Sequence, residues 1–179
     1  MSDSRAYVEE LMAIHQPCDD REAHSLEKFR QIVPTLPDLF TRDNREHVTA
    51  SAVIVGRRGT ILHKHKSLKK WIQPGGHIEA DEFPYDAAIR EALEETGLVV
   101  SHPHDRPTFI HFDVHHAAND HIHLDLRYLA IAEDLDPNPP PNESQDVKWF
   151  SFHEAIPLTD PAGKSALLIA EECWRDGLS

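Results

Sequence analysis

The chain has few cysteines, few cationic side chains and no long apolar run, and each shortage excludes a class of protein. Its 179 residues contain two cysteines, Cys18 and Cys173, without the spacing of a metal or redox motif. Two reduced thiols fit a cytoplasmic protein. No apolar run approaches the roughly 20 residues that span a membrane, and the acidic N-terminal stretch lacks an apolar signal core. We therefore expect a cytoplasmic protein that does not enter a membrane.

The shortage of cations gives the chain a strong negative charge. Lys and Arg number 18 against 31 Asp and Glu, a net charge of −13 with histidine neutral. This charge argues against binding to polymeric nucleic acid or to an anionic membrane. The cations are also unevenly placed, because no acidic residue occurs between His47 and Ile78. That window holds one third of them: Arg57, Arg58, Lys64, Lys66, Lys69 and Lys70. It could attract a polyphosphate, or it could be a solvated basic hairpin.

An acidic stretch follows this window and organises the rest of the chain. Residues 84–96 favour a helix, with Pro84 in its first turn, Gly97 as its stop, and Asp81 or Glu82 as its cap. Helical spacing puts three glutamates on one face: Glu91, Glu94 and Glu95. Clustered carboxylates repel one another on a solvated surface, whereas a hard cation such as Mg²⁺ prefers oxygen ligands of this kind. Arg90 could hold Glu82 or Glu94 through a bidentate pair.

These residues together resemble the Nudix box, G-x5-E-x7-R-E-U-x-E-E-x-G-U, where U is a bulky aliphatic residue. The matching positions are Gly76, Glu82, Arg90, Glu91, Glu94, Glu95, Gly97 and Leu98. Ala92 is small for an aliphatic position, and Phe83 replaces a small capping residue. The resemblance implies an α/β fold (α+β by stricter usage), a mixed sheet between helices. We expect a Nudix domain over residues 46–179, with residues 1–45 as a helical extension packed on it.

The resemblance also implies a metal-dependent hydrolase that cleaves a diphosphate linkage in a nucleoside diphosphate derivative. Its cofactor would be Mg²⁺ or Mn²⁺, held by Glu91, Glu94, Glu95 and the carbonyl of Gly75. Glu82 and Arg90 would brace the site. The base would be Glu91 or Glu143, with Asp146 as the reserve for Glu143. A homodimer is a family-level expectation. The alternatives are an isoprenyl-diphosphate isomerase, which would need a cysteine in the core, and a binding module without turnover.

Two further regions are predicted to form strands, the first from its Val, Thr and Ile content and the second from its alternation of apolar and polar residues. Residues 47–55 and 60–65 predict one pair, and residues 108–132 predict a hairpin through residues 117–120. In that hairpin, apolar side chains stand at even positions. The odd positions carry His111, Asp113, His115, His121, His123, Asp125 and Arg127. A register that keeps the even positions together puts all of these on the opposite face.

This polar face has three interpretations. It could be a substrate-facing wall, a transition-metal site of imidazoles and carboxylates, or a solvated sheet face. In the resembled family the central sheet lines the substrate pocket, which favours the first. Our candidate substrate-binding residues are Arg57, Lys64, Lys70, His77, His111, His123 and Arg127.

Overall fold

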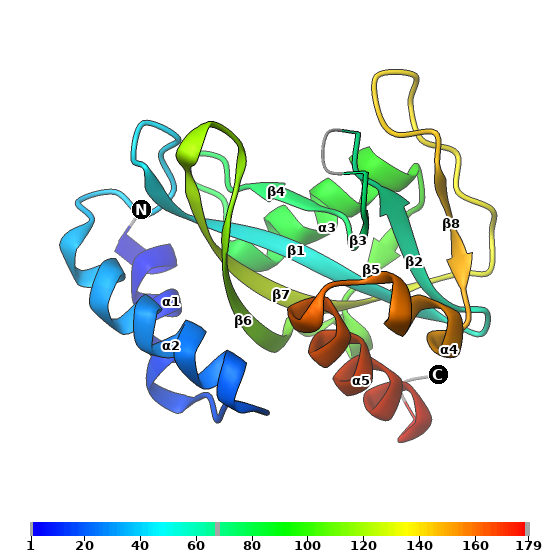
Figure 1. The fold of residues 1–179 in the computed structure, drawn as a ribbon, viewed down its shortest axis with the longest axis horizontal. Helices are drawn as coiled ribbons and strands as arrows, with labels where there is room; N and C mark the ends of the chain where they lie inside the picture. Colours follow the sequence, from blue (N-terminus) through cyan, green and yellow to red (C-terminus); the bar gives the residue numbers. More distant parts are fainter. Residues whose placement is uncertain (1, 67–68, 178–179) are drawn as a thin grey trace.

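The computed structural model describes residues 2–66 and 69–177. Within these residues the strands form one mixed sheet of eight, in which β3-β2-β1-β7-β5 lie in that order, β4 pairs with β1, β6 with β7 and β8 with β2. Figure 1 shows the sheet with helices at both ends. The strands are β1 (Glu46–Gly56), β2 (Gly59–Lys64), β3 (Trp71–Ile72), β4 (Gly75–His77), β5 (Val100–Ser101), β6 (Thr108–His116), β7 (Ile122–Ala132) and β8 (Val147–Phe150). The helices are α1 (Ser2–Ile14), α2 (Asp20–Ile32), α3 (Pro84–Thr96), α4 (Phe152–Ala155) and α5 (Pro161–Arg175).

The centre of the sheet is a parallel pair, β1 and β7, and the remaining pairs are antiparallel. Both central strands are rich in Val, Ile, Leu and Ala, as strands buried on two faces usually are. Strand β4 pairs with β1, so that Gly75 lies opposite Ser51 and His77 lies opposite Thr49. The loop that precedes α3 is therefore fixed to the middle of the sheet.

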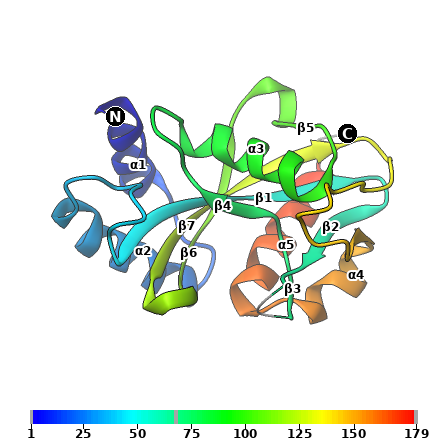
Figure 2. The same ribbon diagram turned by 90° about the horizontal axis from the view of Figure 1, so that it is seen from above.

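Helices cover both faces of the sheet, as Figure 2 shows with α3 on one side and α5 on the other. On the α3 side, even-numbered residues of β1 and β7 join a core that includes Ala87, Ala88 and Ala92 of the helix. On the α5 side, Val53 and Leu129 pack with Leu167. The alternation of strand side chains thus supplies two separate cores. The predicted mixed sheet between helices is confirmed.

The N-terminal helices α1 and α2 pack at one end of the sheet and contribute to the core on the α3 side. Asp19 caps α2 by accepting the N–H of Glu22 at 2.8 Å, and the ring of Phe29 meets that of Phe112 on β6 at 4.8 Å. The helical extension is therefore packed against the sheet, although its boundary at residue 45 stays a prediction. In the described part of the chain, no helix combines the length and apolar character needed to cross a bilayer.

The β6–β7 hairpin keeps the predicted register over most of its length. His111 opposes Arg127, Asp113 opposes Asp125 and His115 opposes His123. A bulge between Phe109 and His111 breaks the alternation, so our placement of Ile110 with the even positions is wrong. Ile110 instead joins the core on the α5 side. An extra residue in one strand reverses the side-chain direction on one side of it.

Candidate active site

The acidic stretch forms a loop and a helix, as the sequence predicts. Helix α3 runs from Pro84 to Thr96, and its C-cap residue is Gly97, whose φ of 70° suits a residue without a Cβ. The predicted cap by Asp81 or Glu82 is wrong, because Phe83 occupies the N-cap position and makes no side-chain cap hydrogen bond. The carboxylate of Glu82 accepts hydrogen bonds from the N–H of Glu79 and from Arg90 instead.

Arg90 connects the loop to the helix. Its Nε and Nη2 donate to the two carboxylate oxygens of Glu82, each at 2.9 Å, which is the predicted bidentate pair. Its Nη1 lies 2.8 Å from Oε1 of Glu91 and 3.4 Å from Oε1 of Glu94. Nη2 also donates to the backbone carbonyl of His77 at 2.8 Å. One guanidinium therefore fixes the loop, the end of β4 and a carboxylate of the cluster.

The three glutamates of α3 have different environments. The side chains of Glu91 and Glu95 are 14% and 16% exposed, while that of Glu94 is 54% exposed. The pKa of Glu95 is raised to about 8, mainly by burial and also by the nearby carboxylates of Glu91, Glu143 and Glu94. The N–H of Gly75, which donates to Oε2 at 2.9 Å, opposes this shift. Burial also raises the pKa of Glu91, with Arg90 opposing the shift. Carboxylates crowded in this way favour their protonated form unless a cation binds beside them.

The paired glycines let this cluster approach the backbone. A Cβ at Gly76 would lie 2.5 Å from Oε1 of Glu91, and a Cβ at Gly75 would lie 2.3 Å from the Cβ of Ser51. Either side chain would displace a neighbour. The oxygen donors present therefore suit a hard divalent ion, with Glu91, Glu94, Glu95 and the Gly75 carbonyl as its candidate ligands.

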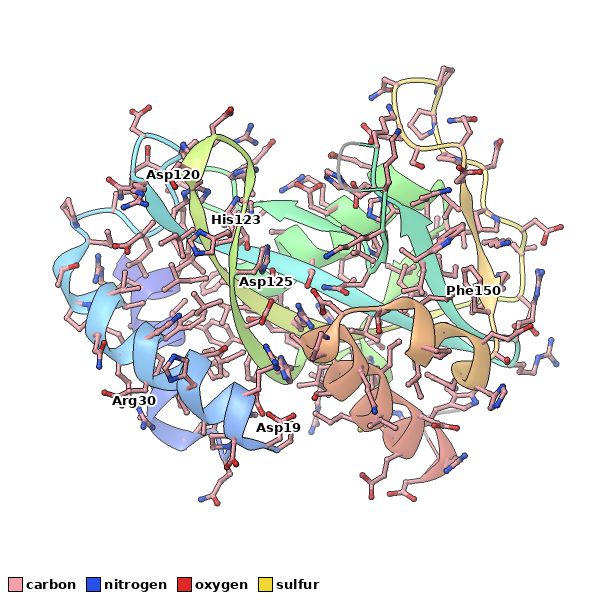
Figure 3. All side chains as sticks on the ribbon, viewed as in Figure 1. Asp19, Arg30, Asp120, His123, Asp125 and Phe150 are labelled. Carbon is pink, nitrogen blue, oxygen red and sulfur yellow. The ribbon has the colours of Figure 1, made fainter. Side chains whose placement is uncertain are left out.

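The cluster opens into a cavity of about 670 Å³. One end of the cavity is formed by Gly75, Gly76, Glu91 and Glu94, and the middle by Thr49, Ser51 and Asp125. The other end is rich in imidazoles: His77, His115, His121 and His123 line it. Figure 3 labels His123, nearer the hairpin loop, and Asp125, nearer the middle of the molecule. The hairpin and the acidic helix thus face one site.

A buried ionic network supports the middle of the cavity. Asp125 accepts hydrogen bonds from Thr49 at 3.1 Å and from Ser51 at 2.8 Å, and Arg127 lies 3.2 Å from it. Arg127 also donates to Asp113 at 2.8 Å and is 3% exposed. The Arg127 guanidinium thus lies behind the cavity wall and is engaged with two carboxylates.

The polar face of the hairpin is not a solvated one. His111, Asp113, Asp125 and Arg127 are buried, and His115 and His123 are half-buried. Burial lowers the pKa of His123 to about 3 and that of His77 to about 4, and it also lowers the pKa of His47. These imidazoles are therefore neutral at neutral pH. The structure brings His77 and His123 to the cavity, but it places His111 beside Cys18 and Glu22 and away from the cavity lining.

The cationic candidates lie elsewhere. Arg57 stands in the β1–β2 turn, where it pairs with Asp134 at 2.6 Å, and its neighbour Arg58 pairs with Asp136 at 2.7 Å. Lys64, at the end of β2, and the exposed Lys70 are not among the described residues that line the cavity. None of the lysines and arginines of the basic window is therefore among the described residues that line the cavity.

The loop carboxylate proposed as base lies near the cluster. Glu143 is half-buried, accepts a hydrogen bond from Asn142 at 2.9 Å, and contributes to the raised pKa of Glu95. Asp146 is exposed, and its carbonyl accepts the N–H of Lys64.

Sequence reasoning missed several residues that line the cavity: Arg42, His65, Ile72, Gln73, His116 and Asn119. Most of them stand in loops, where no periodic pattern marks a side chain's direction. His47 is buried at the imidazole end of the cavity, whereas the sequence pattern predicts only that it belongs to a strand.

A mixed sheet between helices, with an arginine-braced glutamate cluster at the start of a cavity, defines the class of protein: a Nudix-type pyrophosphohydrolase. The chain belongs to the Nudix family, since the family model described as NUDIX domain matches residues 43–170. Phosphatase NudJ of Escherichia coli is 30% identical over 139 residues, which cover 74% of this chain and 86% of NudJ. The predicted family and enzyme class are confirmed.

Solved structures agree with this assignment. A NUDIX family hydrolase from Clostridium perfringens has a TM-score of 0.61 and 32% identity, covering 74% of this chain and 97% of that one. A MutT NUDIX hydrolase from Burkholderia pseudomallei has a TM-score of 0.57 and 27% identity, and the match covers 70% of this chain and 98% of that one.

A further sequence relative matches only a short part of the chain. The m7GpppN-mRNA hydrolase NUDT17 of Danio rerio is 45% identical over 49 residues, which cover 27% of this chain and 16% of that relative.

Proposed function

We propose that this enzyme hydrolyses the diphosphate linkage of a small nucleoside diphosphate derivative and requires Mg²⁺ or Mn²⁺. The observation that carries the proposal is the crowding of Glu91, Glu94 and Glu95 beside Gly75, with the pKa of Glu95 raised to about 8. A site that holds this much negative charge at one end of a cavity suits a divalent ion and the phosphates bound to it.

In this proposal the ion is held by the three glutamates and the Gly75 carbonyl. When bound, the ion would neutralise charge on the diphosphate and lower the pKa of a water molecule. Arg90 keeps Glu91 in position through its 2.8 Å contact, and Glu82 keeps Arg90 in position through the bidentate pair. Glu91 or Glu143 takes the proton from the attacking water.

The rest of the cavity supports a substrate larger than a diphosphate. About 670 Å³ lies in the range of small-molecule sites, and its lining mixes imidazoles with Ile72 and with the hydrogen-bonding side chains Gln73 and Asn119. Such a lining suits a base or sugar beyond the phosphates. The net charge of −13 favours a small substrate over a polymeric nucleic acid.

The test is hydrolysis of a panel of nucleoside triphosphates, dinucleotides and nucleotide sugars with Mg²⁺ and with Mn²⁺. We expect the wild type to turn over at least one compound, and Glu95→Gln to lower that turnover by about 100-fold or more. Glu133→Gln, which changes an exposed carboxylate outside the cavity lining, is the matched control and keeps wild-type turnover. Equal turnover by Glu95→Gln and the wild type would refute the assignment of the metal ligands.

The same panel addresses the alternatives. Tight binding of a compound without turnover would indicate a binding module. An isomerase would need a cysteine at the site, but Cys18 is exposed, Cys173 is half-buried on α5, and neither is among the described residues that line the cavity.

A further inference from the structure

Three histidines from three adjacent strands meet at the imidazole end of the cavity. His47 on β1 is opposite His123 on β7, and His77 ends β4 on the other side of β1. The ring of His47 stacks on that of His77 at 5.1 Å and meets that of His123 at 4.9 Å, while the rings of His77 and His123 are 5.3 Å apart. One ring nitrogen from each residue lies within 4.8 Å of the other two.

His47 is arranged as metal-binding histidines commonly are. Its ring is fully buried, and its Nδ1 lies 3.0 Å from the backbone carbonyl of Asn44. A carbonyl only accepts, so Nδ1 carries the hydrogen and Nε2 keeps a free lone pair. Among the described residues, Nε2 of His47 has no hydrogen-bond partner. A hydrogen bond from one ring nitrogen to a backbone carbonyl is the usual way to orient the other nitrogen toward a metal.

The other two ligands are held from opposite sides. The backbone carbonyl of His77 accepts a hydrogen bond from Arg90, and His123 lies within the β1–β7 ladder. His77 and His123 line the cavity, whereas His47 lies behind them and does not line it. An ion among the three would therefore have protein on one side and open space on the other.

We propose that His47, His77 and His123 form a binding site for a transition metal of the zinc class, with one coordination position open to the cavity. Three imidazoles without a carboxylate suit Zn²⁺, Co²⁺, Ni²⁺ or Cu²⁺ and not the hard ions that suit the glutamate cluster. Zinc–nitrogen distances of about 2.0–2.1 Å in a tetrahedron require nitrogens about 3.3 Å apart, so a bound ion would draw together ring nitrogens that lie within 4.8 Å of one another. The proposal does not depend on the hydrolytic function.

The second cluster of this kind serves as a comparison. Cys18, Glu22 and His111 also bring candidate ligand atoms within 4.8 Å. There, however, the Glu22 carboxylate already accepts hydrogen bonds from the N–H groups of Cys18 and Phe112 and contacts His15 at 2.7 Å. Its oxygens are engaged within the protein, so this cluster is a weaker ligand set than the three histidines.

Co²⁺ is the probe, because tetrahedral Co²⁺ absorbs visible light far more strongly than octahedral Co²⁺. The full chain without a polyhistidine tag is stripped with a chelator and titrated with Co²⁺ in excess Mg²⁺, which occupies oxygen sites. We expect one Co²⁺ per chain with tetrahedral absorption that Zn²⁺ abolishes. His77→Ala and His123→Ala should weaken binding by about tenfold or more, and His153→Ala, an exposed histidine on α4, should bind as the wild type does.

Glu95→Gln separates this proposal from the hydrolytic one, since it should lose turnover and keep the Co²⁺ absorption. Absence of the absorption in the wild type, or unchanged absorption and affinity in His123→Ala, would overturn the proposal. If the histidine variants do not fold, X-ray absorption of the zinc-loaded wild type in excess Mg²⁺ decides. A zinc spectrum that shows three imidazole ligands would support the site. A spectrum that shows only oxygen ligands around the zinc would refute it.

Discussion

Replacing Glu95 by glutamine should stabilise the metal-free protein at alkaline pH while it removes activity. The pKa of the Glu95 carboxyl is raised from 4.5 to about 8, first by burial and then by the nearby carboxylates. A carboxyl whose pKa is higher in the folded state favours folding while it is protonated. Its stabilising effect is complete below the unfolded pKa of 4.5 and is lost as pH rises toward 8. Glutamine resembles the protonated form at every pH.

The magnitude follows from the size of the shift. Between pH 4.5 and 8 the free energy of unfolding should fall by about 1.4 kcal/mol per pH unit on account of Glu95 alone. From pH 6 to pH 8 the loss is roughly 2 kcal/mol, because the slope falls to half at the folded pKa of about 8. This is an upper limit, because salt and water near the partly open cluster screen the carboxylates. Glu95→Gln should therefore gain roughly 2 kcal/mol over the wild type between these two pH values.

The assay is urea unfolding at pH 6 and pH 8 in the presence of a chelator, with turnover measured separately with Mg²⁺. Glu133→Gln is the matched control, because its carboxylate is exposed and lies outside the cavity lining. We expect the control to follow the pH dependence of the wild type. If Glu95→Gln loses as much stability as the wild type between pH 6 and pH 8, the pKa of Glu95 is not raised in the folded protein.

Other substitutions test the supports of the site. Arg90→Lys loses the fork that holds Glu82, so kcat should fall about 10- to 100-fold in steady-state kinetics; an unchanged kcat would remove its bracing role. Gly76→Ala places a methyl 2.5 Å from the Glu91 carboxylate, so activity should need about tenfold more Mg²⁺ with little change in Tm. At Glu22, burial raises the pKa, but hydrogen bonds outweigh it and lower the pKa from 4.5 to about 2. The ionised carboxylate therefore stabilises the fold above pH 4.5, and this effect is lost as pH falls toward 2. Glu22→Gln should therefore lower the free energy of unfolding by about 3 kcal/mol at pH 7 and by clearly less at pH 3; an equal loss at both pH values would contradict the shift.

The parts of the site that depend on local spacing could be predicted from the sequence. Helical periodicity predicts that the three glutamates of α3 share one face. The motif spacing, which puts Arg90 eight residues after Glu82, predicts their pairing. The register of the hairpin follows from its alternation. The bulge between Phe109 and His111 could not be predicted, because Ile110 also fits the series of apolar residues at even positions.

Contacts distant in sequence could not be predicted either. The basic window suggested a phosphate site, yet Arg57 pairs with Asp134 and Arg58 with Asp136, each more than 70 positions away. The odd face of the hairpin was expected to be accessible, yet Arg127 is buried between Asp113 and Asp125. Charge patterns in a sequence show which groups need partners, but the sheet order determines which partners they find.

Strand β1 sets the distance between the two ends of the cavity. Ser51 opposes Gly75 of the glutamate site, Thr49 opposes His77, and His47 is opposite His123. Four residues of strand separate Ser51 from His47, or about 13 Å. A substrate whose diphosphate lies at the glutamates therefore reaches His123 with the group beyond its phosphates. Side chains at the histidine end should accordingly affect the choice among substrates more than the rate of phosphorus–oxygen cleavage, because they act on the part of the substrate that does not react.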